Sequence, residues 1–507
     1  MRRSLVQPLA STLTLLGALC LRATAQVLPG IPVPVENPIT EEKRVLGKIL
    51  FWEEQLSTDN TVACGTCHRP ASGGADPRVA LHPGPDGIFF NDDDVFGSRG
   101  VVRRDVSGQP VSDPVFGFSP QVTRRAAPSF LSAQHATDIF WDGRATTQFD
   151  DPETGAMVIQ FNGALESQSV RPILSDVEMA KEGRTWDDVR AKLAAAAPLA
   201  LATNLPPDVA AAIAANPTYQ DLFAAAFGDV KITGARIAMA IATYERTVFP
   251  DQTPFDRGTL TPDQRAGSQI FAAATQCVIC HEPPLFTDGS FRNLGIRPIA
   301  EDIGRQAVTG NVDDRAKFKV PSLRGVGLRR AFMHNGQRTT LQQVLDFYGD
   351  PEQQFGDNVD PILPTIASHD NLIIDFLSNG LTDARAAAEV FPFDRPILAS
   401  EAPPSDATWP PVGLPGALTR NAAFPNPFGS ITTVNYSLTE SRYVTVIFYD
   451  VTGRQVRQFV AGRQGPGEHR VTWNGTDKAG RRERTGVYLY RIVAGSETGH
   501  GRLVLIR

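Results

Sequence analysis

The sequence predicts a multidomain protein in which two mainly α-helical domains are followed by a small all-β sandwich. Three observations support this fold class. The pattern C-x-x-C-H occurs at 64–68 and again at 277–281, near segments with helical apolar periodicity. A proline-rich stretch interrupts the chain at 396–417. Beyond residue 418 the apolar periodicity becomes two, which is typical of β-strands.

The first 25 residues have the features of a secretory signal peptide. Two arginines follow Met1, an apolar run extends over Leu9–Leu21, and Ala23–Ala25 forms a small-residue cleavage site. The apolar run is too short to remain as a transmembrane anchor. We therefore expect an exported protein, in the periplasm, at the cell surface or secreted.

The cysteines identify a cofactor. In C-x-x-C-H, two thiols bond to the vinyl groups of a c-type haem and the histidine becomes the proximal iron ligand. Paired C-x-x-C motifs also bind zinc, but a histidine directly after both pairs favours haem. We predict two covalently bound c-type haems. The residues that would hold them are Cys64, Cys67 and His68 at the first site, and Cys277, Cys280 and His281 at the second.

The bulk properties set limits on the function. A net charge of −6 with both signs interspersed argues against a nucleic-acid-binding surface. A hydrophobic content of 42% is enough for several cores, and 507 residues suffice for about three domains.

The domain boundaries follow from composition and helix signals. Residues 26–254 are expected to form the first haem domain and residues 255–395 the second, because Thr261-Pro262 predicts the start of a helix that leads to the second pentapeptide. Residues 69–125, rich in Gly, Pro and Asp, predict a long irregular loop region. Its segment Asp86–Asp94 suits a calcium ion, although a solvated acidic turn is the simpler interpretation.

Short segments around the two pentapeptides form a recognisable set. They are Arg125–Ser129, Ile139–Ala145, Leu165–Ser169, Asp176–Met179, Phe286–Asp288, Asn293–Gly295, Asp302–Arg305, Phe318–Arg324 and Phe332–Gly336. In this order they resemble the bacterial dihaem cytochrome c peroxidases. The resemblance implies two mainly α, cytochrome c-like haem domains. One departure is a segment between Ala145 and Leu165 that is inserted relative to compact family members.

The resemblance assigns roles to three side chains. Trp141 matches the tryptophan that lies between the haems and assists electron passage. Gln168 and Glu178 match the polar pair on the distal side of the peroxidatic haem. A carboxyl group at that place can carry a proton between the two peroxide oxygens, and a donor can orient the peroxide. We take Glu178, Gln168 and Trp141 as the catalytic candidates.

The distal ligand of the first iron has one candidate. His82 lies fourteen residues after His68, at about the spacing of a loop histidine that ligates the first iron in many oxidised family members. A solvent-exposed loop histidine is an equal alternative.

The second iron has two candidate distal ligands. The family's ligand follows the His-x-Gly turn by about fourteen residues, which gives Tyr348, whereas Met333 adjoins the histidine of that turn. Residues 339–348 predict a capped helix that places Tyr348 on its apolar face, so we favour Tyr348. A tyrosine ligand is typical of the MauG-like branch, and it lowers the reduction potential.

These features lead to three functional hypotheses. The first is a secreted dihaem peroxidase that reduces hydrogen peroxide at the first haem, with electrons relayed from the second haem and supplied by a small cytochrome c or cupredoxin. The second is MauG-like, peroxide-dependent oxidation of Trp or Tyr residues on a partner protein. The third is a non-catalytic electron carrier in which both irons have two permanent ligands.

The last domain, residues 418–507, carries its own set of motifs. They are Pro425–Phe428, Tyr449–Arg454, Val471–Gly475, Asp477–Gly480 and Gly486–Arg491. They resemble the Ig-like domain shared by flagellar hook-capping proteins and secretion-sorting tails. The resemblance implies an Ig-like β-sandwich that serves export, surface attachment or docking to secretion or cell-surface machinery.

Overall fold

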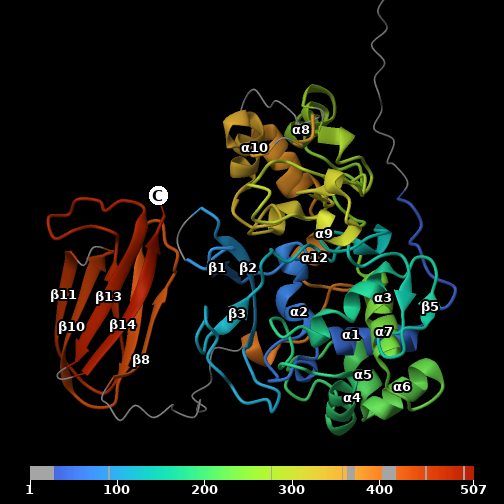
Figure 1. The fold of residues 1–507 in the computed structure, drawn as a ribbon, viewed down its shortest axis with the longest axis horizontal. Coiled ribbons are helices and arrows are strands. Elements are labelled where there is room, and N and C mark those ends of the chain that lie inside the picture. Colours follow the sequence, from blue (N-terminus) through green and yellow to red (C-terminus); the bar gives the residue numbers. More distant parts are fainter. Residues whose placement is uncertain are drawn as a thin grey trace, which may run out of the picture. The chain divides into compact units, whose positions relative to one another are not determined.

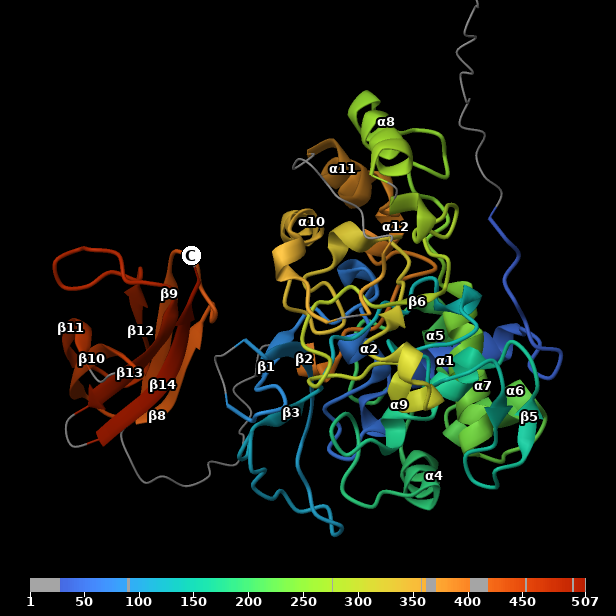
Figure 2. The same ribbon diagram turned by 45° about the horizontal axis from the view of Figure 1, so that its top comes forward.

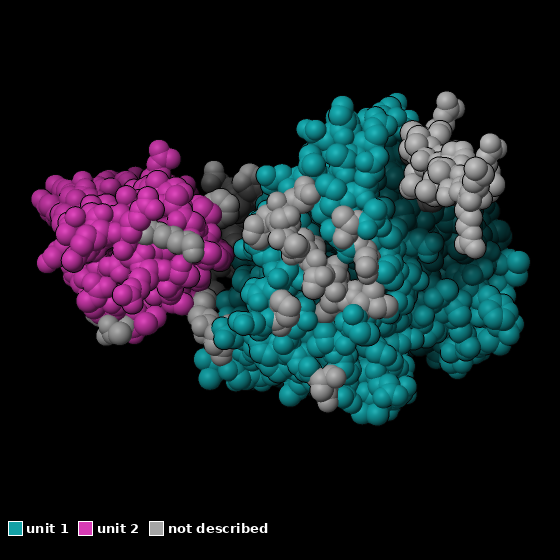
Figure 3. All heavy atoms as spheres, turned by 90° about the horizontal axis from the view of Figure 1, so that it is seen from above, with its two compact units in different colours: residues 1–403 teal, residues 404–507 magenta. Residues whose placement is uncertain are grey.

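A computed structural model describes residues 28–88, 92–275, 277–356, 358–361, 371–401, 418–451, 454–494 and 497–506. The chain divides into two compact units, residues 1–403 and 404–507 (Figure 3). The predicted signal peptide and residues 402–417 of the predicted linker lie outside the described residues. Among the described segments, no helix has the length and apolar character needed to cross a membrane.

The first unit consists of short helices joined by long irregular segments (Figure 1). The helices are α1 (Glu41–Phe51), α2 (Cys64–Cys67), α3 (Ala164–Ser169), α4 (Trp186–Ala195), α5 (Pro207–Ala215), α6 (Tyr219–Phe227), α7 (Gly234–Thr247), α8 (Pro262–Gln269), α9 (Gln306–Thr309), α10 (Leu341–Gly349), α11 (Asn371–Asp375) and α12 (Ala384–Ala387). The prediction of mainly α haem domains is confirmed only in part, because irregular segments and small sheets separate these helices.

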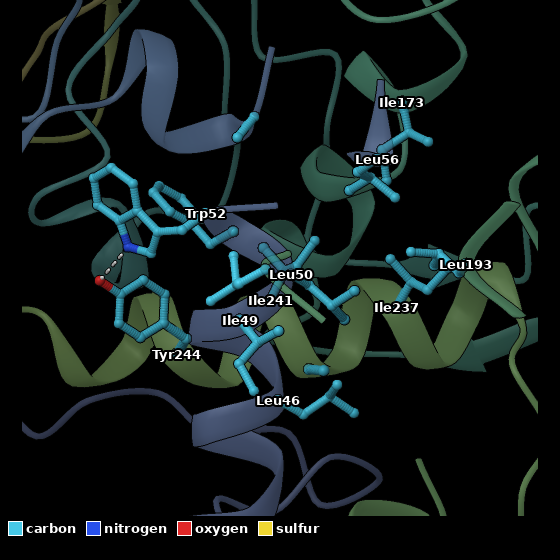
Figure 4. Packing of buried hydrophobic residues seen from close by; sticks show 14 of the residues in the cluster. Leu46, Ile49, Leu50, Trp52, Leu56, Ile173, Leu193, Ile237, Ile241 and Tyr244 are labelled. Atoms are coloured by element: carbon cyan, nitrogen blue, oxygen red, sulfur yellow. Dashed lines mark hydrogen bonds between the residues drawn. The ribbon is translucent and has the colours of Figure 1, made fainter. Parts of the chain in front are cut away.

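The core of the first half forms where α1 packs against α7 (Figure 4). Thr40 caps α1 by accepting a hydrogen bond from the backbone N–H of Lys43. The apolar stripe of α1 is buried, and side chains such as Leu46 and Ile49 share one cluster with Ile241 of α7. Fully burying one such side chain contributes about 1.5–3 kcal/mol. This cluster is the base on which the first pentapeptide, in α2, is placed.

The end of the first unit returns to this core. Phe393 and Leu398 are buried in the same cluster, and Ile397 forms a β-bridge with Thr203. Buried Lys48 of α1 lies 3.0 Å from the Asp394 carboxylate. Residues 396–401, the beginning of the predicted linker, are therefore part of the first unit and pack on its core.

The second half has a smaller core around α8 and α11, which pack together (Figure 2). Thr261 caps α8 by accepting from the N–H of Gln264, and proline occupies the first helical position as predicted. A π-helical turn at Ile270–Ala274 then leads to the second pentapeptide. Residues 1–403 form one compact unit, so the boundary near residue 254 remains a prediction about its two haem-binding halves.

The segment predicted as irregular loops holds a small sheet. Strands β1 (Val79–His82), β2 (Val95–Val102) and β3 (Pro120–Val122) pair antiparallel in the order β1-β2-β3. Gly100 of β2 is required because a Cβ there would lie 1.8 Å from the carbonyl oxygen of Val177. Glycine lowers β-propensity, so the strand is poorly visible in the sequence.

Two further strand pairs are short. The inserted segment forms the hairpin β4 (Phe149–Asp150) and β5 (Met157–Ile159), whose Phe149 and Ile159 pack on α7. In the second half, β6 (Phe291–Arg292) pairs with β7 (Phe318–Lys319). The insertion is thus an ordered part of the first half.

The second unit is the predicted all-β domain. Its strands are β8 (Leu418–Phe424), β9 (Thr432–Leu438), β10 (Arg442–Asp450), β11 (Gln455–Gln464), β12 (Gly467–Trp473), β13 (Gly486–Ala494) and β14 (Glu497–Leu505). They form two antiparallel sheets in the orders β11-β10-β13-β14 and β12-β9-β8. Both sheets contribute to one core, in which Trp473 of β12 stacks on Phe448 of β10 with ring centroids 4.7 Å apart.

Candidate haem sites and the wall between them

The first pentapeptide borders a cavity of about 900 Å³. Cys64, Cys67 and His68 line it. The second residue of the motif is glycine because a Cβ at Gly65 would lie 2.2 Å from the ring of Trp52. The cavity is of the size that proteins use for large cofactors, about 300–1,000 Å³.

Both pentapeptide histidines are oriented in the same way. His68 Nδ1 lies 3.1 Å from the carbonyl oxygen of Gly74, and His281 Nδ1 lies 3.1 Å from that of Phe286. A carbonyl oxygen accepts a hydrogen bond, so Nδ1 carries the imidazole proton and Nε2 keeps its lone pair for a metal. Burial lowers the pKa of both imidazoles, which favours the neutral form that ligates iron.

The residues of both sites fit c-type haem. The four thiols are free, and each pair lines a cavity together with its histidine. Across the part of the chain that the structure describes, no group of three or more His, Cys, Asp or Glu side chains is placed to hold a metal ion. The zinc alternative and the calcium site at Asp86–Asp94, of which Asn91 lies outside the described residues, therefore gain no support.

The catalytic candidates meet at the first cavity. Gln168 of α3, Glu178 and Trp141 all line it. The backbone N–H of Glu178 donates to the Ser175 carbonyl oxygen (3.2 Å), which holds the backbone of Glu178 at the cavity. Burial raises the pKa of the Glu178 carboxyl, so the group holds a proton at higher pH than an exposed glutamate does.

His82 also lines the first cavity. It ends β1, is only 8% exposed, and contacts the ring of Phe116 edge-on with centroids 5.7 Å apart. The alternative of a solvent-exposed loop histidine is therefore wrong, because pairing of β1 with β2 and packing against Phe116 bury the ring. Its Nδ1 has no hydrogen-bond partner among the described residues.

The second cavity contains both candidate distal ligands. Tyr348 and Met333 line it together with Cys277 and Cys280. The predicted helix is confirmed as α10, capped by Thr340, which accepts from the N–H of Gln343 (3.1 Å). Burial raises the pKa of the Tyr348 phenol, so the phenol is neutral in the polypeptide alone.

The two cavities share a wall. Its residues, which line both cavities, are Ala126, Ala127, Pro128, Ser129, Trp141, Arg297, Asp302 and His334. The indole N–H of Trp141 donates to the Ala126 carbonyl oxygen (2.8 Å), and the Lys319 N–H donates to the Trp141 carbonyl oxygen (2.8 Å). The tryptophan is therefore held by both halves of the unit.

A cluster of charged side chains includes Asp302, a residue of the wall. Arg125 forms two hydrogen bonds of 2.7 Å with the Asp302 carboxylate and one of 2.6 Å with Asp142. Burial opposes ionisation of both carboxyl groups, but the Arg125 guanidinium keeps the pKa of each below its usual value. The cluster links residues that are far apart in sequence, so the motifs did not reveal it.

Sequence reasoning missed a second acid in the first cavity. Glu245, near the end of α7, is 5% exposed and lines the cavity. Its Oε2 has no hydrogen-bond partner in the described structure, and burial raises its pKa to about 8. A signal was present, since Glu245 continues the spacing of Ile237 and Ile241 and so interrupts an apolar helix face with a carboxyl group.

Comparison with known proteins identifies the relatives. The family model for di-haem cytochrome c peroxidase matches residues 41–264, and the model for the FlgD Ig-like domain matches residues 428–498. The methylamine utilization protein MauG of Methylorubrum extorquens is 30% identical over 328 residues, which span 63% of this chain and 71% of that protein. Cytochrome-c peroxidase IdrP1 of a Pseudomonas species is 27% identical over 360 residues, which span 63% and 75%.

A solved structure shares the fold of the first unit. A MauG-like protein associated with microbial copper homeostasis superimposes with a TM-score of 0.52 at 24% identity, over 73% of this chain and 96% of that chain. The resemblance stated from the motifs is confirmed. The chain therefore belongs to the di-haem cytochrome c peroxidase family of oxidoreductases, which includes MauG, and it has a FlgD-type Ig-like domain at its carboxyl-terminal end.

Proposed function

We propose that this protein is an exported peroxidase that reduces hydrogen peroxide in the first haem cavity, with electrons relayed from the second haem. The unequal lining of the two cavities carries the proposal. Gln168 and Glu178 line the first cavity, whereas Tyr348 and Met333 line the second. Proton-transfer groups thus accompany the first haem site, and two candidates for a permanent second ligand accompany the other.

The side chains of the first cavity suit the proton part of the reaction. When bound, the two haems supply the one-electron redox chemistry. Hydrogen peroxide takes up two electrons and two protons and leaves as two water molecules. Glu178 can carry a proton from one peroxide oxygen to the other, because its raised pKa lets the carboxyl group hold and release it. The amide N–H groups of Gln168 can orient the peroxide.

The wall between the cavities suits electron transfer from the second haem to the first. Trp141 borders both cavities, and its indole is fixed by the hydrogen bond to the Ala126 carbonyl. An aromatic side chain in this place can divide the electron transfer between the two redox centres into shorter through-space steps. Electrons would come from a small redox protein such as a cytochrome c or a cupredoxin.

His82 adds a switch to the first site. Its buried ring lines the cavity and leaves Nδ1 without a partner in the described structure. We therefore take His82 as a ligand that occupies the first iron in the oxidised protein and leaves on activation. A His82→Ala variant should then bind cyanide without prior reduction, whereas the parent protein should not.

MauG-like oxidation of Trp or Tyr on a partner protein is the second candidate function. The position of Tyr348 in the second cavity favours it. A phenolate from Tyr348 would donate charge to the second iron and stabilise its oxidised state, which suits withdrawal of electrons from a protein. Met333 as the ligand would have the opposite effect and favours ordinary peroxide reduction.

Spectroscopy of two variants separates the candidates. If phenolate ligates the second iron, Tyr348→Phe changes the EPR and visible spectra of that haem, and Met333→Leu does not. The reverse result assigns Met333 as the ligand. Tyr443→Phe, an exposed position in the second unit, is the matched control for loss of a phenol.

Ligand exchange tests whether the protein is an enzyme at all. At least one haem should take up cyanide or peroxide in some redox state, since catalysis requires an exchangeable position. If neither haem does so in the oxidised, half-reduced or fully reduced protein, the non-catalytic electron carrier replaces both enzyme proposals.

We place the protein outside the cytoplasm. The amino-terminal sequence has a signal-peptide pattern, and haem attachment at C-x-x-C-H normally takes place after export. The FlgD-type Ig-like domain would dock to secretion or cell-surface machinery. Fractionation of cells that produce the full chain tests this location.

A further inference from the structure

A turn of the second half lies in the wall between the cavities. We call Phe332–Gly336 the histidine turn. The backbone N–H of Ala126 donates to the His334 carbonyl oxygen (2.8 Å). The N–H of Phe96 in β2 donates to the Asn335 carbonyl oxygen (2.8 Å). The first half of the unit therefore fixes the backbone of a turn that belongs to the second half.

The backbone of the histidine turn is strained. Met333 has a φ of +68°, in the left-handed region that a methionine enters only at a steric cost. Such a conformation persists where the surrounding contacts determine it, and it is concentrated at functional sites. The next two residues of the turn are His334 and Asn335.

Those two side chains are buried and incompletely bonded. His334 is 5% exposed and Asn335 is 3% exposed. His334 Nδ1 and Asn335 Nδ2 have no hydrogen-bond partner among the residues that the structure describes. Because a buried polar group without a partner is costly, each of the two nitrogens indicates a partner other than the described residues.

The cavities indicate where these partners lie. Asn335 lines the first cavity. His334 lines both cavities, and its ring stacks on Phe318, a residue of the second cavity, with centroids 3.6 Å apart and planes 9° apart. The stack fixes the orientation of the imidazole ring and holds it beside Phe318 in the second cavity.

The chemistry of c-type haem supplies the matching acceptors. The thioether bonds use the vinyl groups and leave two propionate carboxylates on each haem. A carboxylate accepts N–H hydrogen bonds, and these charge-assisted bonds are about twice as strong as neutral ones. A buried water molecule is the competing partner.

We propose that His334 and Asn335 are positioning residues that donate hydrogen bonds to haem propionates, Asn335 at the first site and His334 at the second. The histidine turn thereby couples the two haems through one rigid element. Such a hydrogen bond disperses propionate charge, so its loss stabilises oxidised iron and lowers the reduction potential. The proposal rests on haem attachment at both sites and not on peroxide as the oxidant.

Redox titration of the full-length holoprotein tests the proposal, with EPR spectra to follow each haem. Asn335→Ala should lower the potential of the first haem and leave the second unchanged. His334→Ala should lower that of the second haem, and His334→Gln, which keeps an N–H donor, should restore part of the shift. His135→Ala is the matched control, because His135 has a buried ring nitrogen without a partner in the described structure but lines neither cavity.

The outcomes are distinct. Potentials of the His334 and Asn335 variants that stay within the range of the His135 control overturn the proposal and leave water as the partner. Shifts in the opposite haems overturn the assignment of each residue to its site. If His334→Ala does not retain two haems, the comparison of His334→Gln with Asn335→Ala carries the test. Because potentials are measured without turnover, loss of peroxidase activity does not decide it.

Discussion

The two haem cavities are alike at the attachment histidine and different in the rest of their lining. His68 and His281 both use Nδ1 to bond a backbone carbonyl. The cavity at His68 is the larger of the two, and its lining includes carboxyl and amide groups. The cavity at His281 is lined mainly by apolar side chains, together with Tyr348, Met333 and charged groups such as Asp302. Local sequence determines the attachment side, and distant segments determine the rest.

This difference shows how one motif can serve two purposes. The pentapeptide fixes only two thioether bonds and one ligand, so it is compatible with either catalysis or electron transfer. Gln168, Glu178 and Glu245 of the first cavity come from α3, the segment before α4, and α7, all in the first half. The second receives its candidate ligands from α10 and the histidine turn.

The largest expected effect is loss of the acid in the first cavity. Glu178→Gln should lower peroxidase turnover by about 10²–10⁴-fold, because an amide cannot relay a proton. Haem content and the spectrum of the second haem should not change. Steady-state turnover with a reduced cytochrome donor is the measurement.

A neighbouring glutamate provides the control for this variant. Glu182 lies four residues further on and is exposed, so Glu182→Gln makes the same chemical change outside the cavity. Its turnover should match that of the parent protein. Equal turnover in the Glu178→Gln variant would remove this carboxyl group from the mechanism and end the functional contrast between the cavities.

The next effect is on the stability of the wall. Arg125→Met leaves the Asp142 and Asp302 carboxylates without their shared cation, which should cost about 3 kcal/mol, the lower end for breaking a buried pair. The loss should be largest at neutral pH. Stability from carboxyl groups with lowered pKa is present above the unfolded pKa and disappears as the pH falls through the folded one.

Urea unfolding followed by haem absorbance measures this loss. Arg454→Met is the control, since Arg454 pairs with Asp450 on the exposed surface of the second unit, where solvent screens the ion pair and its contribution to stability is small. If the Arg125 variant unfolds at the urea concentration of the parent protein at pH 7, the cluster does not hold the wall together.

Local signals in the sequence were sufficient for part of this picture. The pentapeptides, the cap of α8 at Thr261 and the capped helix α10 all depend on residues within one or two turns, and they were predicted. The sequence overestimates the helix content of the first unit, in which irregular segments and small sheets separate short helices. The β1-β2-β3 sheet was missed because its closest backbone contact requires Gly100, which lowers β-propensity.

The wall could not be predicted from spacing alone. Arg125 and Asp302 meet across 177 positions, and His334 borders two cavities only after both halves have folded together. The resemblance to a family pointed to Trp141, but not to the ion cluster or to the unpartnered nitrogens beside it. These are properties of tertiary packing, which no local pattern encodes.

A pH-dependent effect on stability is expected from the second acid of the first cavity. Burial raises the pKa of Glu245 to about 8, above its value in the unfolded chain. The folded state then binds the proton more tightly, so Glu245 lowers stability as the pH rises from the unfolded pKa to the folded one, by up to about 1.4 kcal/mol per pH unit. Glu245→Gln should remove this slope.

The measurement is the unfolding free energy of the parent protein and of the Glu245→Gln variant between pH 5 and pH 9. The variant should gain stability relative to the parent protein toward pH 9 and differ little at pH 5. A difference that is independent of pH would mean that Glu245 is ionised throughout, paired with a cation that the haem-loaded cavity supplies.

The smallest expected effect on catalysis comes from the largest deletion. The second unit has its own core, and the described residues of that core all lie between 423 and 505. None of these residues belongs to the hydrophobic clusters around α1 and α7 or around α8 and α11 in the first unit. Each unit therefore has an independent source of stability. A chain that ends at Pro403 should keep both haems and full turnover while its cellular location changes. Loss of turnover in the purified truncated protein would show that the sandwich supports the haem cavities themselves.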